Sequence, residues 1–399
     1  MAMLGRGSAQ TCGQRRMRTG EQGNEEHMRH SGQPGLVARV ARIAMALAIG
    51  MAVGMTGACG SQPATTATNQ PTASEEKSAN NGKQSAEPSE QPTNSTTVVP
   101  LYVKGAKLLD EQNHPRQLRG VSTHGIAWFP QYVNAELFGN LKREWGINTV
   151  RLAMYTGEEG GYTTDGNKEG LRKLVHQGVD AAIKQDLYVI VDWHTLSDNN
   201  PLISVDEAKR FFDEMSHDYA GKPNVIYEIR NEPNGGTTWA QVKQYAEQII
   251  PVIRANDKNA LILVGTPNWC QNIEAAEADP ITSAGNLMYT MHFYAAEYHE
   301  ELRNAMVSAV ESGFPVFVSE FGLTQASGDG AIDTASAQAW LNAMDEHDIS
   351  YVIWNLSNKN EGSALFVTGE IRNPQTSDLT AEAKWYRDYL KQHATEANR

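Results

Sequence analysis

Two glutamates stand at the ends of apolar runs, where a residue that only filled a core would be hydrophobic. Glu232 lies in EIRNEPNGG, between an asparagine and a proline, and Glu320 lies in PVFVSEFG. Two carboxyl groups can work on one bond from its two sides: one protonates the departing oxygen, and the other attacks or activates water. The bond that such a pair would break depends on the surrounding side chains and on the fold that positions them.

The elements that position these glutamates can be counted from the pattern of apolar residues after Val98. Short apolar runs alternate there with amphipathic stretches of helical period. Eight runs have the composition of buried strands: 119–125, 148–155, 187–194, 224–231, 260–266, 287–294, 315–322 and 349–357. Helices are expected at 135–146, 169–185, 205–221, 239–255, 301–313, 334–348 and 380–393. The connection at 271–280 has only a weak helical pattern.

This alternation predicts an α/β fold. Strands separated by helices pair in parallel, and runs that are apolar on both faces belong to a sheet covered by helices. Eight such units predict a closed (β/α)8 TIM barrel within 98–399. A doubly wound open sheet is the alternative, but it usually has fewer strands and a Gly-rich turn after the first, whereas STHG ends the first run here. Residues 98–120 are expected to form a short N-terminal β-hairpin that closes the barrel floor.

Polar and aromatic side chains gather where the predicted strands end, which is where a barrel of this kind carries its chemistry. These residues are His124, Tyr155, His194, Asn231 with Glu232, His292 with Tyr294, Glu320, and Trp354 with Asn355, and Arg151 lies inside the second strand. Each alone has an ordinary structural interpretation, such as a hydrogen-bonded histidine or a packed tryptophan. Their convergence on one end of the barrel favours a binding and catalytic site.

The two glutamates come from the fourth and seventh strands, so they are expected to face each other across the barrel mouth. Cleavage of a glycosidic bond uses such a pair, and a separation of about 5 to 5.5 Å leads to retention through a covalent intermediate. A nearby Arg151 would keep Glu320 ionised. Partial burial and a neighbouring negative charge would raise the pKa of Glu232 so that it holds a proton.

The chain from about residue 98 to 393 resembles glycoside hydrolase family 5, and its bacterial endo-β-1,4-glucanase (cellulase) members in particular. The matching segments are GVSTHGIAWF, NTVRLAMY, VIVDWH, IYEIRNEPNG, MHFY, VFVSEFG and WNLSNKNEGSAL. The resemblance implies a retaining endo-glycosidase that hydrolyses internal β-1,4-glucosidic bonds of cellulose or related soluble β-glucans by double displacement. It implies Glu232 as the acid/base, Glu320 as the nucleophile and Asn231 as the group that binds the 2-hydroxyl beside the cleaved bond.

The same matching implies further contacts. Arg151 and Tyr294 should hold Glu320, and His194 and His292 should line the site. The groups expected to contact sugar on the non-reducing side are His124, Trp128, Tyr155, Trp354, Lys359 and Glu361, and Trp269 is expected on the leaving-group side. Because indole rings stack on glucose, these well-spaced tryptophans favour an extended cleft over a closed pocket. Arg230 and Pro130 depart from the family pattern.

Some of these residues would also suit other functions. A β-mannanase or a mixed-linkage or xyloglucan hydrolase could use the same catalytic pair. A lipoprotein that binds oligosaccharides without cutting them would explain the aromatic residues but would have no need of paired glutamates. A metal hydrolase is disfavoured, because no His-x-His or carboxylated-lysine pattern groups His124, His194 and His292. We therefore expect no metal and no cofactor.

Residues 1–59 have the order of an export signal. Arg39 and Arg42 precede the apolar stretch IAMALAIGMAVGMTGA, which is shorter than the ~20 residues of a spanning helix and ends at Cys59. The small residues directly before Cys59 resemble a bacterial lipoprotein box, although Thr56 stands where leucine is usual. Ordinary signal-peptidase cleavage and free secretion are the alternative. We expect an extracellular protein, and Met28 is an alternative start.

Composition indicates the character of the remaining segments and of the ligand. Residues 60–97 contain no aromatic residue, Leu, Ile, Val or Met, so they are expected to form a disordered Ser/Thr/Pro-rich linker before a single catalytic domain at 98–399. A formal net charge of −13 argues against nucleic acid and suits a neutral β-glucan. Cys270 is the only cysteine after the linker, so no disulfide is expected there, and its thiol is interpreted as a small packed group. We expect a monomer, attached to a membrane only if Cys59 carries a lipid.

Overall fold

The computed structural model describes residues 98–369 and 374–393. The predicted signal, lipoprotein box and linker lie outside the described residues. The described part contains a two-stranded antiparallel sheet and a closed barrel whose eight strands follow the order β10-β3-β4-β5-β6-β7-β8-β9. All neighbouring barrel strands pair in parallel. The prediction of a (β/α)8 barrel is confirmed, and the open doubly wound sheet is excluded.

Each barrel strand falls within one of the predicted apolar runs. The strands are β3 (Arg119–Thr123), β4 (Thr149–Tyr155), β5 (Tyr188–His194), β6 (Val225–Glu228), β7 (Leu261–Gly265), β8 (Leu287–Tyr294), β9 (Val316–Gly322) and β10 (Tyr351–Leu356). The largest difference is in β6, which ends at Glu228 although the apolar run continues to residue 231. Beyond Glu228 single hydrogen bonds to the neighbouring strands continue, since the amide of Ile229 donates to the carbonyl of Leu263 and the amide of Asn231 donates to the carbonyl of Trp193.

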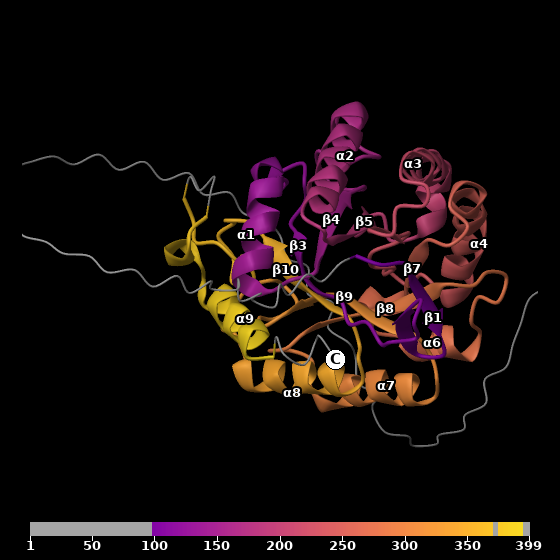
Figure 1. Cartoon of the computed structure of the whole chain (residues 1–399). Helices are drawn as coiled ribbons and strands as arrows, with labels where there is room; N and C mark the ends of the chain where they lie inside the picture. The colour runs from indigo at the N-terminus through magenta and orange to yellow at the C-terminus, as the bar shows by residue number, and fades with distance from the viewer. Residues whose placement is uncertain (1–97, 370–373, 394–399) are drawn as a thin grey trace, which may run out of the picture. The chain divides into compact units, whose positions relative to one another are not determined.

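Helices surround the strands in Figure 1. They are α1 (Ala135–Trp145), α2 (Lys168–Lys184), α3 (Val205–Asp218), α4 (Trp239–Asn256), α7 (Glu300–Glu311), α8 (Thr334–Glu346) and α9 (Ala381–Gln392). Side-chain caps mark where several of them begin; at α4, Thr238 and Gln241 form a reciprocal capping box. Between β7 and β8 the chain forms only the short helices α5 (Pro267–Cys270) and α6 (Ile273–Ala278), in agreement with the weak helical pattern there.

The N-terminal hairpin packs against the end of the barrel at which its strands begin. Its strands β1 (Leu101–Lys104) and β2 (Lys107–Asp110) pair antiparallel. Leu101 and Leu108 belong to one apolar cluster with side chains of the barrel strands: Tyr188, Ile190, Ile226, Leu261, Leu263, Met288, Phe317 and Val352. The hydroxyl of Tyr188 also donates to the carbonyl of Val99 at 2.9 Å. The hairpin therefore closes the floor, as predicted, and leaves the opposite end for the site.

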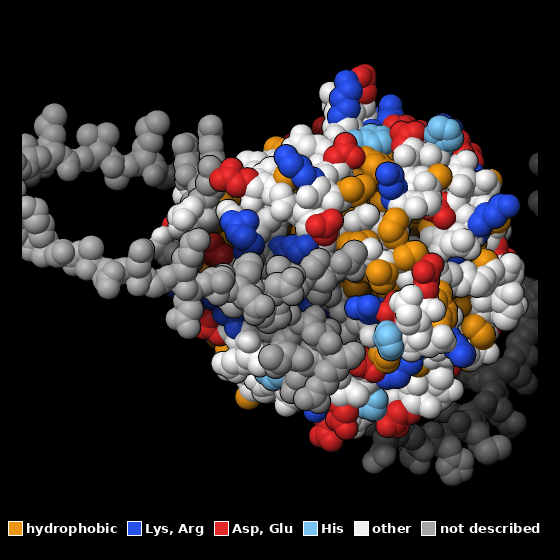
Figure 2. Space-filling view, in the orientation of Figure 1, with side chains coloured by type: hydrophobic (Ala, Val, Ile, Leu, Met, Phe, Trp, Pro, Cys, Tyr) orange, Lys and Arg blue, Asp and Glu red, His pale blue; other side chains and the backbone are white. Residues whose placement is uncertain are grey.

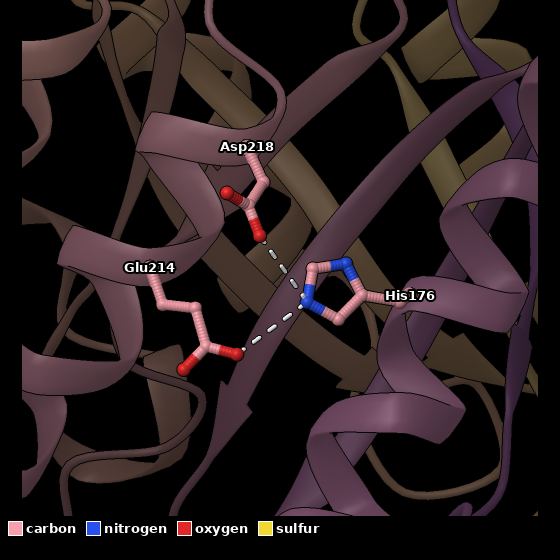
Figure 3. Close-up of side chains that lie close together, drawn as sticks. All are labelled: His176, Glu214 and Asp218. Carbon is pink, nitrogen blue, oxygen red and sulfur yellow. Dashed lines mark ion pairs between the residues drawn. The ribbon is translucent and has the colours of Figure 1, made fainter.

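A histidine and two carboxylates join α2 to α3 in the outer ring (Figure 3). The Nε2 atom of His176 lies 3.5 Å from Glu214 and 3.7 Å from Asp218. The two acidic residues are four apart on α3 and so share a face. Glu214 is also paired with Arg172 at 3.0 Å, and His176 Nδ1 contacts the Tyr219 hydroxyl at 2.9 Å. These contacts explain the cluster as a structural one that links the two helices.

One face of the molecule is drawn in Figure 2. On that face Lys and Arg side chains are interspersed with Asp and Glu. This face does not concentrate the positive charge that phosphate backbones require. Within residues 98–369 and 374–393, no helix combines the length and the apolar composition needed to cross a bilayer.

Candidate active site

A cleft of about 510 Å³ opens where the carboxyl ends of the strands meet. Twelve of the fourteen predicted site residues line it: His124, Trp128, Tyr155, His194, Glu232, Trp269, His292, Tyr294, Glu320, Trp354, Lys359 and Glu361. Arg151 and Asn231 do not line the cleft; both are fully buried and lie behind it. Arg151 can thus act on a ligand chiefly through the groups that it holds.

The two predicted catalytic carboxyl groups meet across the mouth. One oxygen of Glu232, one oxygen of Glu320 and one ring nitrogen of His292 all lie within 4.8 Å of one another. Such an approach of the nearest oxygens is in agreement with the short class of carboxyl pairs, about 5 to 5.5 Å apart, in which the second carboxylate attacks directly. The geometry can therefore support double displacement.

A bulge in β9 lets two consecutive residues, Ser319 and Glu320, serve the site. Against β8, Thr290 pairs with Phe317 and His292 with Glu320, so β9 carries one extra residue in that interval. The register with β10 shifts in the same stretch. Bulges of this kind re-aim side chains beside active sites. Ser319 consequently contacts groups inside the barrel while its neighbour Glu320 faces the cleft.

Glu320 is held by two donors. The Tyr294 hydroxyl donates to Oε1 at 2.8 Å, and Arg151 Nη1 donates to Oε2 at 3.0 Å. Burial alone would lower the pKa of Arg151, but the carboxylates of Asp192, Glu228 and Glu320 raise it well above its usual value. The guanidinium is thus a permanent cation beside Glu320. A hydrogen bond from such a cation stabilises the ionised carboxylate that a nucleophile needs.

Glu232 is in the opposite electrostatic situation. Burial raises its pKa to about 8; Arg151 opposes that rise, and the carboxylates of Asp192 and Glu228 add to it. Its Oε1 atom lies 2.9 Å from Nδ1 of His292. At neutral pH the Glu232 carboxyl therefore holds a proton, in agreement with the expectation from burial and neighbouring negative charge.

Two buried acids behind the cleft, Asp192 and Glu228, were not among the predicted site residues. Glu228 pairs with Arg151 at 2.7 Å, and Asp192 Oδ2 lies 3.0 Å from Arg151 and 2.6 Å from His194 Nδ1. The signal was present, because a carboxylate inside an apolar strand is unusual unless it is paired. Asp192 also stands two residues before His194, on the same face of β5.

Asn231 is fixed by the same network. Its Oδ1 atom accepts from Arg151 at 2.6 Å, and its Nδ2 donates to the carbonyl of Thr195 at 3.1 Å and lies 3.3 Å from His194 Nε2. The neighbouring Arg230, which departs from the family pattern, is fully buried and donates to the carbonyl of Asn199. Burial lowers the pKa of Arg230 to about 10, so it stays charged. Arg230 does not line the cleft.

Aromatic rings form one wall of the cleft. Trp128 lies 4.7 Å from Tyr155 and 5.5 Å from His124 between ring centroids, and His124 lies 5.1 Å from Trp354. A Cβ atom at Gly125 would come within 2.5 Å of the Trp128 ring, so only glycine permits this approach. Trp128 keeps 39% of its surface exposed, which leaves an indole face available to a sugar.

Trp269 is presented by a left-handed turn within α5. Asn268, Trp269 and Cys270 have φ of 58°, 54° and 59°, a conformation that costs L-residues about 1 to 2 kcal/mol each. The turn is held by the Trp269 amide, which donates to the carbonyl of Pro233 at 3.1 Å. The Cys270 thiol is buried and donates to the carbonyl of Asn231, in agreement with a packing role. Trp269 is left 45% exposed, an arrangement that no local sequence pattern indicated.

Further cleft residues come from loops beyond the strand ends. These are Glu158, Leu196, Gln271, Tyr298 and residues 326–328. They were not among the predicted residues, because they are neither the last residues of an apolar run nor part of the site that the family resemblance implied. A search of the loops that follow each strand could have found them, because barrel sites are built from those loops.

The spacing of Glu232, His292 and Glu320 would also permit a metal ion on distance alone. The ionic contacts favour another arrangement. Glu320 is already paired with a guanidinium, and the raised pKa of Glu232 leaves it protonated at neutral pH. A protonated carboxyl is a poor metal ligand. The absence of a metal and of a cofactor stays a prediction.

Comparison with known proteins identifies the family. A family model described as cellulase (glycosyl hydrolase family 5) matches residues 109–360, which include all eight barrel strands and both glutamates. The chain belongs to glycoside hydrolase family 5. This family is a retaining one, in agreement with the short spacing of the two carboxyl groups.

Curated relatives carry endoglucanase names. The chain is 45% identical over 297 residues to endoglucanase A of Butyrivibrio fibrisolvens, in a match that covers 73% of this chain and 68% of the relative. It is 44% identical over 287 residues to endoglucanase A of Evansella cellulosilytica, with 70% and 57% covered. The chain thus spans between about half and two thirds of the length of these relatives.

Solved structures of the family superpose on the barrel. The catalytic domain of Thermobifida fusca endoglucanase Cel5A, as a variant in complex with cellotetraose, matches with a TM-score of 0.70 and 39% identity over 74% of this chain and 98% of that one. The catalytic domain of alkaline cellulase K matches with a TM-score of 0.68 and 32% identity over 74% and 94%. The family 5 chain is therefore a glycoside hydrolase with the barrel of known cellulases.

Proposed function

We propose that this family 5 enzyme is a retaining endo-β-1,4-glucanase acting on cellulose or related soluble β-glucans. The observation that carries the proposal is that a carboxylate oxygen of Glu232, a carboxylate oxygen of Glu320 and a ring nitrogen of His292 lie within 4.8 Å of one another. The exposed rings of Trp128 and Trp269 line the same cleft. The endoglucanase names of its relatives and the cellotetraose held by a similar barrel support a β-glucan as the substrate.

The first step forms a covalent intermediate. The carboxylate of Glu320 attacks the anomeric carbon as Glu232 gives its proton to the glycosidic oxygen, so one C–O bond forms while another breaks. Arg151 and Tyr294 donate to the two oxygens of Glu320 and keep its carboxylate aimed at that carbon. The leaving chain departs with the proton, and an ester joins the remaining sugar to Glu320.

The second step reverses the roles. Glu232, now ionised, takes a proton from a water that attacks the anomeric carbon, and the ester to Glu320 breaks. Two inversions give net retention. Asn231, fixed by Arg151 and Thr195, is proposed to bind the 2-hydroxyl during both steps. Trp128, Trp354 and Trp269 are proposed to stack on glucose units on the two sides of the cleaved bond.

Hydrolysis of a panel of polysaccharides tests this function. We expect purified protein to release reducing ends from carboxymethylcellulose faster than from mannan or xyloglucan, with an early fall in viscosity because internal bonds are cut. NMR of the first product should show the β-anomer. Faster hydrolysis of mannan or xyloglucan would support the other hydrolases instead. A protein that binds cello-oligosaccharides without releasing reducing ends would be a binding lipoprotein, and the proposal would be wrong.

We propose that the enzyme acts outside the cell, secreted or held at the outer face of the membrane by a lipid on Cys59. The order of charged, apolar and small residues before Cys59 supports this location. In a bacterial host we expect the full chain to take up labelled palmitate and to sediment with membranes, whereas Cys59→Ala should do neither. An unlabelled wild-type protein in the culture medium would instead indicate free secretion.

A further inference from the structure

A chain of buried hydrogen bonds leads away from Glu232 into the barrel. Its Oε1 atom lies 2.9 Å from His292 Nδ1, and His292 Nε2 lies 2.9 Å from the hydroxyl of Ser319. That hydroxyl donates to Oε1 of Glu228 at 2.8 Å. His292, Ser319 and Glu228 are each at most 1% exposed, so water does not compete for these contacts.

The inner end of this chain is anchored by Arg151. Its Nε atom donates to Oε2 of Glu228 at 2.7 Å, and its Nη2 atom donates to Oε1 at 3.2 Å. Both oxygens of Glu228 therefore accept from one guanidinium, a geometry that suits the ionised carboxylate. The same Arg151 donates to Glu320, so the chain connects the proposed acid to the proposed nucleophile behind the cleft.

The number of protons in this series of hydrogen bonds decides which atom donates in each bond. Ser319 has one hydroxyl proton, and donating it to Glu228 leaves its oxygen as an acceptor for His292 Nε2. Burial lowers the pKa of His292 to about 4, so the ring is neutral at working pH and carries one N–H. With that proton on Nε2, the Nδ1 atom presents a lone pair to Glu232. A lone pair there accepts from a protonated carboxyl and repels an ionised one.

The opposite arrangement would have the opposite effect. If Ser319 donated to His292 Nε2, the ring proton would sit on Nδ1 and donate to Glu232, which would favour the ionised carboxylate. Ser319 would then leave Oε1 of Glu228 without its hydroxyl donor. The buried carboxylate of Glu228 therefore selects between the two tautomers of His292.

We propose that Ser319 and Glu228 are positioning residues that keep the His292 proton on Nε2 and thereby hold Glu232 in its acid form. The inference rests on the proposed function and deepens it. In the first step these hydrogen bonds keep Glu232 protonated, so that it can donate its proton. In the second step the Nδ1 lone pair opposes the ionised Glu232, so that it takes a proton from water more readily.

Other titratable groups also face Glu232 and His292. They are Arg151 and Tyr155 from β4, Asp192 and His194 from β5, Glu228 from β6, Cys270 from α5, Tyr294 from β8, Tyr298 from the loop after β8, and Glu320 from β9. A substitution at Ser319 leaves all of them in place. A change in the titration of Glu232 in such a variant therefore reports the hydroxyl and the tautomer that it selects.

The first test is the pH dependence of kcat/KM for Ser319→Ala on a soluble β-glucan. We expect the alkaline limb to move down by about one pH unit, because one hydrogen bond that favours the protonated acid is lost. Activity on the acid side should stay close to wild type, and activity above the limb should fall about tenfold. Ser319→Thr keeps a hydroxyl and should keep the wild-type limb.

Ser216→Ala is the matched control. Ser216 is a fully buried serine of α3 whose hydroxyl donates to the carbonyl of Phe212, away from the cleft. It should affect stability without moving the pH profile. Identical alkaline limbs in wild type and Ser319→Ala would overturn the proposal, since a merely structural Ser319 would lower activity equally at all pH values.

The second test reads the tautomer directly and needs no turnover. ¹⁵N NMR of the wild-type protein, assigned by comparison with His292→Gln, should show the His292 proton on Nε2. A proton on Nδ1 would refute the inference even if Ser319→Ala failed to fold. A wild-type protein that releases no reducing ends at any pH would contradict the proposed function alone, because the tautomer can still be measured.

Discussion

Replacing Glu320 by alanine is expected to abolish hydrolysis of β-glucan, with a loss of about 10⁴-fold or more in kcat. The reason is the loss of the carboxylate that both Arg151 and Tyr294 hold in the cleft. Azide should restore cleavage, because it fits the space left by the carboxylate and attacks from the same side. A single displacement then gives a glycosyl azide of inverted configuration, which NMR would identify.

Glu346→Ala serves as the control for this variant. Glu346 is an exposed residue at the end of α8, so its removal should leave turnover unchanged. Full activity of Glu320→Ala without any added nucleophile would reject the nucleophile role. Azide rescue with retained configuration would reject it as well, since a second displacement would then have to come from another group.

Replacing Glu232 by glutamine is expected to have the second largest effect. We expect turnover of β-glucan to fall by about 10² to 10⁴-fold, the usual contribution of a general acid. An aryl cellobioside with a good leaving group should be cleaved with a much smaller loss in the first step, because its leaving oxygen needs no proton. Comparing the two substrates by stopped-flow separates proton donation from binding.

The pH profile gives the same variant a second readout. Burial raises the pKa of Glu232 to about 8, and its acid role requires the protonated form. Wild-type activity should therefore be present below about pH 8 and be lost as pH rises through that value. Glu232→Gln should lack this limb. Glu274→Gln, an exposed change on α6, should keep it, and an unchanged limb in Glu232→Gln would assign the titration to another group.

Arg151 explains how one network can place two carboxyl groups in different electrostatic surroundings. Its guanidinium contacts Glu320 directly at 3.0 Å, whereas Glu232 contacts His292. Asp192 and Glu228 neutralise much of the cation and raise the pKa of Glu232 from behind. The proposed mechanism therefore depends on the buried residues Arg151, Asp192 and Glu228 as much as on the residues that line the cleft.

The sequence by itself determined the architecture and the set of residues at the barrel mouth. Apolar runs and helical periodicity are local signals, readable over a few neighbouring residues, so the eight strands and the floor hairpin were predicted with small errors at their ends. The motifs around Glu232 and Glu320 carried the family. The clearest boundary error among the barrel strands, at the end of β6, arose because an apolar run continued past the last ladder pair at Glu228.

Only the tertiary structure decided how these groups meet. Glu232 and Glu320 come within 4.8 Å because the barrel closes, and no local pattern contains that distance. The bulge in β9 depends on its register with two neighbouring strands, and it places Ser319 beside His292. The three acidic partners of Arg151 come from three other strands. Protonation states follow from burial and charge separation, which are properties of the packed molecule rather than of any segment of its chain.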